Sequence, residues 1–175
     1  ILSGGFGNII DRKIHALLSR IFGLQAYFSK KSTKNLISFI KKQNFDVVHL
    51  RNLHHNYINL RILLEFLARE DIPTVITLND CWAYTGKCTY YTIDNCYRWQ
   101  QNCGNCIRLK KDNPSWFFDQ TVKMLKDKQQ LFNNIPRLAV VGVSDWVTNE
   151  AKKSILKNAN IIKRIYNWIP KDFRP

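Results

Sequence analysis

The chain has 175 residues, of which 45% are hydrophobic, so it can form one folded domain with its own core, and a disordered chain is excluded. Its 27 Lys and Arg against 13 Asp and Glu give a formal net charge of +14, which favours an anionic partner such as phosphate, nucleic acid or an acidic membrane surface. No apolar run approaches the roughly 20 residues needed to cross a bilayer, which excludes a transmembrane helix in this sequence.

The start of the sequence and its cysteines bear on the compartment. Residues Ile1–Phe6 lack the charged and hydrophobic regions of a signal peptide. The cysteines number five, and an odd count in a chain without an export signal fits a reducing compartment, where thiols serve as metal ligands, core residues or reactive groups. We therefore expect a cytoplasmic protein.

Two helices are predicted near the start, at 11–22 and 33–42. The first has one apolar face, formed by Ile14, Leu17, Leu18, Ile21 and Phe22. Between residues 11 and 42 there is a single acid, Asp11, against eight basic residues, which we call the basic flank: Arg12, Lys13, Arg20, Lys30, Lys31, Lys34, Lys41 and Lys42. The basic flank is either a solvated helix surface or a surface that docks on anionic lipid at the inner face of the plasma membrane.

The middle of the chain alternates strands and helices. A short buried strand is predicted at 46–50, a helix at 57–69 and a β-branched strand at 72–78, which together form a strand, helix, strand unit with parallel strands. After a long segment at 79–113, a helix is predicted from Pro114-Ser115 to Phe132, then a strand at 137–144, a helix at 145–156 with Ser144 as its N-cap, and a strand at 161–166. This order predicts an α/β fold with a doubly wound parallel sheet.

Polar residues follow two of the predicted strands, and in open α/β sheets ligands bind where such strands end. Asp80 is a candidate for orienting a substrate hydroxyl, or else it caps a short helical turn at 81–84. Asn79 is beside it. His54 lies in the loop after the strand at 46–50 and is preferred over His55, whereas His49 lies within that strand and fits a hydrogen-bonded core histidine as well as a ligand.

The segment 79–113 holds every cysteine and many aromatic residues. A loop of this length inside a compact domain is usually functional or is stabilised by additional interactions. Zinc is one explanation, with Cys88, Cys96, Cys103 and Cys106 as its ligands, because Cys103-Gly104-Asn105-Cys106 places two thiols at chelating distance. A disulfide formed on isolation and unpaired buried thiols are the others. Cys81 would be a free buried thiol.

The aromatic residues of this segment also have two readings. Aromatic faces pack against sugar rings and apolar tails, and they also fill small cores. We take most of them as core residues and single out Trp82 and Tyr84 as candidates for substrate binding.

Five segments together resemble the N-terminal half of a GT-B glycosyltransferase of family 4, in the bacterial subgroup of exopolysaccharide and colanic-acid-type synthesis. They are 46–54, 79–86, 103–106, 141–147 and 165–170. The resemblance covers nearly all of the chain and implies one partial domain, 1–175, that binds the acceptor. It implies a Rossmann-like sheet with helices on both faces, into which the cysteine-rich loop is inserted.

The resemblance also implies a function for the whole enzyme. A sugar would be transferred with retention, without a metal in the transfer step, from a nucleotide-sugar donor to a saccharide or lipid-linked saccharide. The donor would be bound by a C-terminal domain beyond Pro175, and the chain alone would be inactive. No nucleic-acid partner is implied.

Two departures from the family pattern stand out. The strand at 72–78 usually leads into His-Asp, and here Asn79 replaces the histidine, which removes a potential base and keeps a non-catalytic scaffold open. The family's glycine-rich loop has no clear counterpart, since no strand precedes Gly4-Gly5-Phe6-Gly7-Asn8, which we read as a flexible leader. The rival class is a zinc-stabilised basic nucleic-acid-binding module, favoured by charge, aromatics and cysteines.

Overall fold

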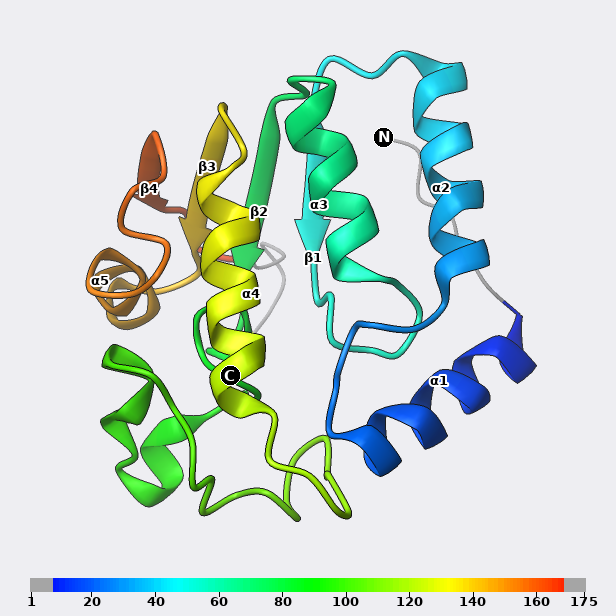
Figure 1. The fold of residues 1–175 in the computed structure, drawn as a ribbon. Coiled ribbons are helices and arrows are strands. Elements are labelled where there is room, and N and C mark those ends of the chain that lie inside the picture. Colours follow the sequence, from blue (N-terminus) through cyan, green and yellow to red (C-terminus); the bar gives the residue numbers. More distant parts are fainter. Residues whose placement is uncertain (1–7, 169–175) are drawn as a thin grey trace.

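A computed structural model describes residues 8–168, and it is an α/β structure built on a parallel sheet. The glycine-rich leader falls almost wholly outside these residues, as does the end of the segment 165–170. The sheet has four strands in the order β1 (Val48–Arg51), β2 (Thr74–Leu78), β3 (Leu138–Gly142) and β4 (Ile161–Arg164), so strand order follows chain order (Figure 1). The predicted α/β fold with a Rossmann-like parallel sheet is confirmed.

Helices connect and flank these strands. They are α1 (Ile9–Phe22), α2 (Lys30–Gln43), α3 (Leu60–Arg69), α4 (Thr121–Asn133) and α5 (Asp145–Lys152). In Figure 1, α3 and α4 lie over one face of the sheet, and α1 lies apart from the strands, below the ends of β1 and α2. No helix among residues 8–168 is long and apolar enough to span a membrane.

One face of the sheet carries most of the core. In β2 and β3 every second residue is buried, including Ile76, Leu78 and Val140, whereas the residues between them are only half-buried. The helix α3 adds Leu63 and Leu67, both with 0% exposure. The helices predicted on both faces of the sheet therefore cover it unevenly. Buried and half-buried residues alternate along the strands, as in a sheet that is packed mainly from one side.

The register of the strands fixes which ends meet. Leu50 pairs with Ile76 and Arg51 with Thr77 across β1 and β2, and Leu78 pairs with Gly142 across β2 and β3. All neighbouring pairs are parallel. The carboxyl ends of β1 and β2 therefore lie side by side, and the loops that leave them form one edge of the molecule.

Side-chain caps fix the starts of two helices: α1, which begins two residues before the predicted start at residue 11, and α5, which begins where the sequence predicts. Asn8 accepts a hydrogen bond from the Asp11 backbone N–H at 2.7 Å, which begins α1 at Ile9. Ser144 accepts one from the Val147 N–H at 3.2 Å, which confirms its predicted role at the start of α5. The φ of Gly23 is +69°, the left-handed conformation that ends α1.

Two sequence predictions are wrong in detail. The helix expected from Pro114-Ser115 begins only at Thr121, after a turn in which the Asp119 side chain accepts a hydrogen bond from the Thr121 N–H at 2.9 Å. Trp116 and Phe117, expected as its apolar positions, are 43% and 68% exposed. They lie in a connection that precedes the helix.

The orientation of α1 also differs from the usual packing of an amphipathic helix. Its apolar stripe faces outward, with Ile14 51% and Leu17 47% exposed, while the polar residues His15 and Ser19 are buried. His15 is held by Ser29, with 2.8 Å between Nδ1 and Oγ, and burial lowers the pKa of His15 to about 4. The periodicity of α1 was predicted, and its packed side was not.

Candidate functional site

The two strand ends bring His54 and Asp80 together. The loop after β1 carries His54, and the turn after β2 carries Asp80, so parallel pairing of the two strands puts both side chains at one edge of the sheet. The distance from His54 Nε2 to Asp80 Oδ2 is 3.8 Å. Both side chains are partly buried, with 11% and 16% of their surface exposed. A ligand at this edge could therefore reach an imidazole and a carboxylate at once.

Asp80 uses its two oxygens differently. Oδ1 accepts a hydrogen bond from the Trp82 backbone N–H at 2.8 Å, at the start of the short helical turn η1 (Trp82–Tyr84). Oδ2 is the atom that faces His54. Both sequence readings of Asp80 thus have a counterpart in the structure, since one oxygen fixes the turn and the other is directed at the candidate site.

The surroundings of His54 favour its neutral form. Burial lowers the pKa of His54, the nearby Asp80 carboxylate raises it, and His55 and Lys128 lower it again. The net direction is downward. Because a neutral imidazole has one nitrogen free to accept a hydrogen bond or proton, His54 can serve as an acceptor at neutral pH, close to a carboxylate that can hold a hydroxyl.

Amide groups extend this edge toward β1. Asn79 accepts a hydrogen bond from Arg51 Nη2 at 3.1 Å and donates one to Asn52 Oδ1 at 3.2 Å. His49 is exposed and shares a 2.7 Å hydrogen bond between its Nε2 and Thr77 Oγ1, so the core-histidine reading is wrong. Arg51 and Asn52 were missed as partners of Asn79, although their position directly after a strand could have suggested them.

A small hollow of about 20 Å³ marks this edge. Its lining includes Asn52, His54, Thr77, Asn79 and Asp80. The hollow is large enough for one water molecule and too small to enclose a ring-sized ligand. The residues predicted for substrate contact at 79–80 and 54 thus line one hollow.

The two predicted aromatic contacts lie deeper than expected. Trp82 is 2% exposed, and its Nε1 donates to Gln25 Oε1 at 2.7 Å. Tyr84 has 0% exposure and packs against Trp99 with ring centroids 5.1 Å apart. Trp82 therefore lines the hollow beside His54. Tyr84 is a core residue, and the prediction that Tyr84 contacts the substrate is wrong for this arrangement.

Lys128 is the residue that sequence reasoning missed. It comes from α4, is 2% exposed, and donates to the carbonyl oxygens of Trp82, Thr85 and Gly86 at 2.6, 2.9 and 3.4 Å. Its Nζ is 3.6 Å from the centroid of the Trp82 ring. Burial lowers the pKa of Lys128 to about 7, opposed by Cys103 and Asp80. Lys128 thereby fixes the turn that carries Asp80.

The cysteine segment does not assemble the predicted four-cysteine site. All five cysteines lie within residues 8–168, and all are free thiols. The Cys88 thiol hydrogen-bonds to Cys106, which lowers the pKa of Cys106 and raises that of Cys88. No group of three or more His, Cys, Asp or Glu in the described part of the chain is placed to hold a metal ion. These thiols do not fit a zinc site in this arrangement.

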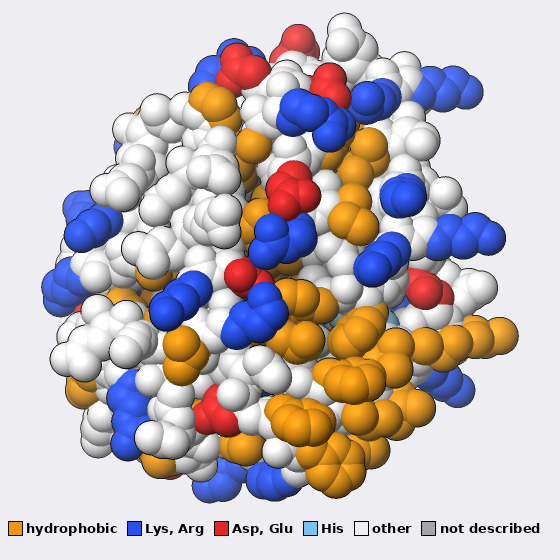
Figure 2. Space-filling view, in the orientation of Figure 1, with side chains coloured by type: hydrophobic (Ala, Val, Ile, Leu, Met, Phe, Trp, Pro, Cys, Tyr) orange, Lys and Arg blue, Asp and Glu red, His pale blue; other side chains and the backbone are white. Residues whose placement is uncertain are grey.

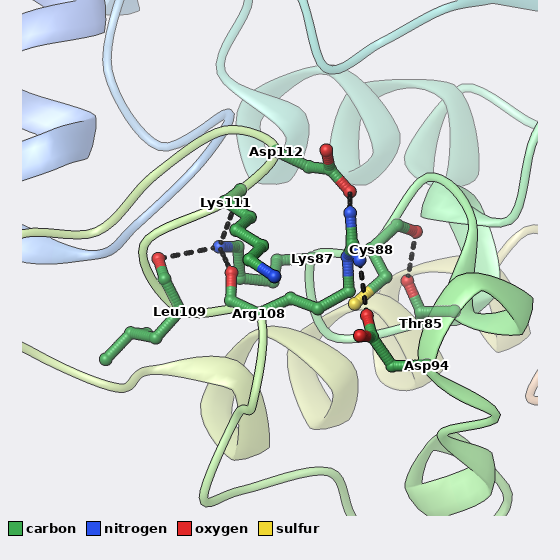
Figure 3. Close-up of polar contacts among 8 residues, drawn as sticks. All are labelled: Thr85, Lys87, Cys88, Asp94, Arg108, Leu109, Lys111 and Asp112. Atoms are coloured by element: carbon green, nitrogen blue, oxygen red, sulfur yellow. Dashed lines mark hydrogen bonds and ion pairs between the residues drawn. The ribbon is translucent and has the colours of Figure 1, made fainter.

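Buried basic side chains hold the segment instead (Figure 3). Lys87 is 1% exposed and donates to the carbonyl oxygens of Arg108, Leu109 and Lys111 at 2.8, 2.9 and 2.9 Å. Arg108 pairs with Asp94 and, at 2.7 Å, with Asp112. These contacts satisfy the backbone of a loop that has little regular structure.

Gly86 and Cys81 complete the junction between this segment and the sheet. A Cβ on Gly86 would lie 2.7 Å from the Thr121 Cβ and 3.1 Å from Cys103 Sγ, so the close approach to α4 requires glycine. Cys81 is buried, as predicted, and burial raises the pKa of its thiol to about 11. The segment is thus packed firmly against α4 beneath the candidate site.

Comparison with curated proteins relates part of the chain to a described bacterial protein. Over 103 residues, 56% of this chain and 25% of the other, the chain is 29% identical to an Escherichia coli K12 protein described as "Putative colanic acid biosynthesis glycosyl transferase WcaC". The match therefore spans about a quarter of that protein's length. No protein-family model matches the chain. No solved structure matches it at a significant level. The match supports a relationship to glycosyltransferases.

Proposed function

We propose that this chain is the acceptor-binding part of a retaining GT-B glycosyltransferase of family 4, acting in cell-envelope polysaccharide synthesis. The observation that carries the proposal is the pairing of His54 with Asp80 at the carboxyl ends of two parallel strands, in a chain similar to a protein described as a glycosyl transferase. In open parallel sheets this edge is where ligands bind. The acceptor would be a saccharide or a lipid-linked saccharide.

The residues would act on the acceptor. Asp80 Oδ2 would accept a hydrogen bond from the reacting hydroxyl and orient it, and the neutral imidazole of His54 would accept or share its proton. The amides of Asn79 and Asn52 would bind neighbouring hydroxyls, since each offers a donor and an acceptor. The nucleotide-sugar donor would be bound by a second, C-terminal domain, and the protein would work in the cytoplasm.

The test is sugar transfer by the full-length protein that contains this chain. Radiolabelled nucleotide sugars would be offered with the lipid-linked saccharides of the source organism, and wild type would be compared with Asp80→Asn. The matched control is Asp46→Asn, because Asp46 is exposed and forms no ion pair among residues 8–168.

We expect transfer by the wild type and the control, and a loss of about 100-fold in kcat/KM for Asp80→Asn. Asparagine keeps an oxygen for the Trp82 N–H, so the fold should persist. Full activity of Asp80→Asn would remove the proposed site. If the wild type transfers sugar from none of the donors, the proposed enzymatic activity is contradicted and a non-catalytic scaffold is favoured.

A further inference from the structure

A basic groove lies on the other side of the loop that carries His54. Its volume is about 510 Å³, the size of a ligand pocket. It lies between α1 and the loop, and is lined by Arg12, Lys13 and Arg20 of α1 and by His55 and Asn56. The small hollow at the strand ends and this larger groove therefore flank one loop.

No acidic side chain among the described residues neutralises the cations of this groove. The structure shows no ion pair or side-chain hydrogen bond from Arg12, Lys13 or Arg20 in residues 8–168, and no acidic residue lines the groove. The one acid of α1, Asp11, accepts a hydrogen bond from Ser32 at 2.6 Å instead. Unneutralised guanidinium and ammonium groups around a cavity are suited to a phosphate, because they can surround its oxygens with charged donors.

The groove is coupled to the candidate site through two adjacent histidines. His54 faces Asp80, and His55 lines the groove, with the two ring centroids 4.4 Å apart. A phosphate bound in the groove would therefore place a directly attached sugar near the His54 and Asp80 pair. The same loop would contact both parts of one ligand.

An exposed apolar surface adjoins the groove along α1. It consists of the outer stripe of α1 and the connection before α4, namely Ile10, Ile14, Leu17, Trp116, Phe117 and Phe118. The Trp116 N–H donates to the Arg20 carbonyl at 2.7 Å, which joins the two parts. Figure 2 shows hydrophobic side chains gathered over the region of α1. Charge on one side of the helix and apolar surface on the other suit an amphiphilic anion.

We propose that the groove binds the phosphate or diphosphate of a lipid-linked saccharide acceptor, and that the lipid tail lies on the apolar surface of α1 and residues 116–118. The saccharide part of this ligand rests on the proposed function, whereas the phosphate site does not. An anionic phospholipid headgroup offers the same phosphate chemistry, so the experiment separates the two sources.

The test is calorimetric binding to the purified chain, with decyl diphosphate as the probe. Inorganic diphosphate, decyl maltoside and phosphatidylglycerol vesicles are the comparison ligands. The groove variant is Arg12→Gln, Lys13→Gln and Arg20→Gln together. The control variant is Lys30→Gln, Lys31→Gln and Lys34→Gln, which removes the same charge from exposed residues of α2 that do not line the groove.

We expect decyl diphosphate to bind more tightly than inorganic diphosphate or decyl maltoside. Its affinity should fall roughly 10- to 100-fold in the groove variant and less than about 2-fold in the control, because direct charged contacts are lost only in the first. Vesicle binding should weaken similarly in both variants, as general attraction to a surface does. A separate variant, Ile14→Ser with Leu17→Ser, should bind decyl diphosphate more weakly and bind inorganic diphosphate with unchanged affinity.

If both charge variants bind decyl diphosphate with equally reduced affinity, the proposed phosphate site in the groove is overturned. Loss of vesicle binding confined to the groove variant would assign the groove to membrane headgroups and overturn the acceptor. Normal sugar transfer by a full-length groove variant would also overturn the proposal that the groove binds the acceptor. If decyl diphosphate binds as expected but the full-length wild type transfers no sugar, the phosphate site stands and the proposed function fails.

Discussion

His54 Nε2 lies 3.8 Å from Asp80 Oδ2, across the carboxyl ends of two neighbouring parallel strands. The pair is partly buried, and Lys128 fixes the turn on one side of it. Because burial opposes charge on the imidazole while Asp80 favours it, the protonation of His54 reports directly on this contact.

The pKa of His54 should lie below its ordinary value of 6.5. Replacing Asp80 by Asn should lower it further, since the carboxylate is the group that raises it. The measurement is an NMR titration of the imidazole protons of the chain, assigned with a His54→Gln variant. The exposed His49 serves as the internal control. A rise of the His54 pKa in Asp80→Asn would contradict the geometry of the pair.

Lys128 should make stability depend on pH. Its pKa is lowered from 10.5 to about 7 in the folded state, so between these values the unfolded chain binds more protons, and stability rises with pH. Relative to Lys128→Met, the wild type should gain roughly 1 kcal/mol of unfolding free energy per pH unit between pH 7 and 10.

Urea unfolding of both proteins across that range provides the measurement. The comparison cancels the contributions of groups that titrate alike in both proteins. A difference in unfolding free energy that is independent of pH would show that Lys128 keeps its ordinary pKa in the fold.

Lys87 should hold the cysteine segment. Its replacement by Met removes the donor from three buried or partly buried carbonyl contacts and should cost about 2 kcal/mol or more. Lys111→Met is the matched control in the same loop, because the Lys111 side chain is exposed, and its effect should stay within about 0.5 kcal/mol. Thermal unfolding and limited proteolysis would measure both. Equal effects would contradict the role of Lys87.

Metal removal should leave the fold unchanged. The segment is held by Lys87 and Arg108, and its thiols do not form a four-ligand set. Chelation should therefore not alter the melting temperature or the protease sensitivity of the chain, and Cys103→Ser should release no metal. A fall in melting temperature with release of about one zinc per chain would support the four-cysteine zinc site instead.

Local sequence signals predicted much of the fold. The β-branched run at 72–78 and the N-cap Ser144 have clear physical meaning, and β2 and α5 form there. Other features depend on packing between distant segments. The periodicity of α1 gives its apolar stripe but not its packed side, and here the stripe is exposed.

The candidate site was predictable in the same uneven way. His54 and Asp80 follow predicted strands, so their meeting could be expected from parallel pairing. Lys128 could not, because a lysine in a polar stretch of α4 looks like a solvated residue until the turn at 82–86 is placed over it. Tyr84 failed as a substrate contact because its burial is set by packing on Trp99.

The most direct test of the central claim is initial-rate kinetics of the full-length protein with both substrates varied. Because Asp80 and His54 are assigned to the acceptor, Asp80→Asn and His54→Gln should lower kcat or raise the KM for the acceptor and leave the KM for the nucleotide sugar unchanged. Asp46→Asn should change neither. A raised donor KM with unchanged acceptor kinetics would contradict the assignment of this chain to the acceptor.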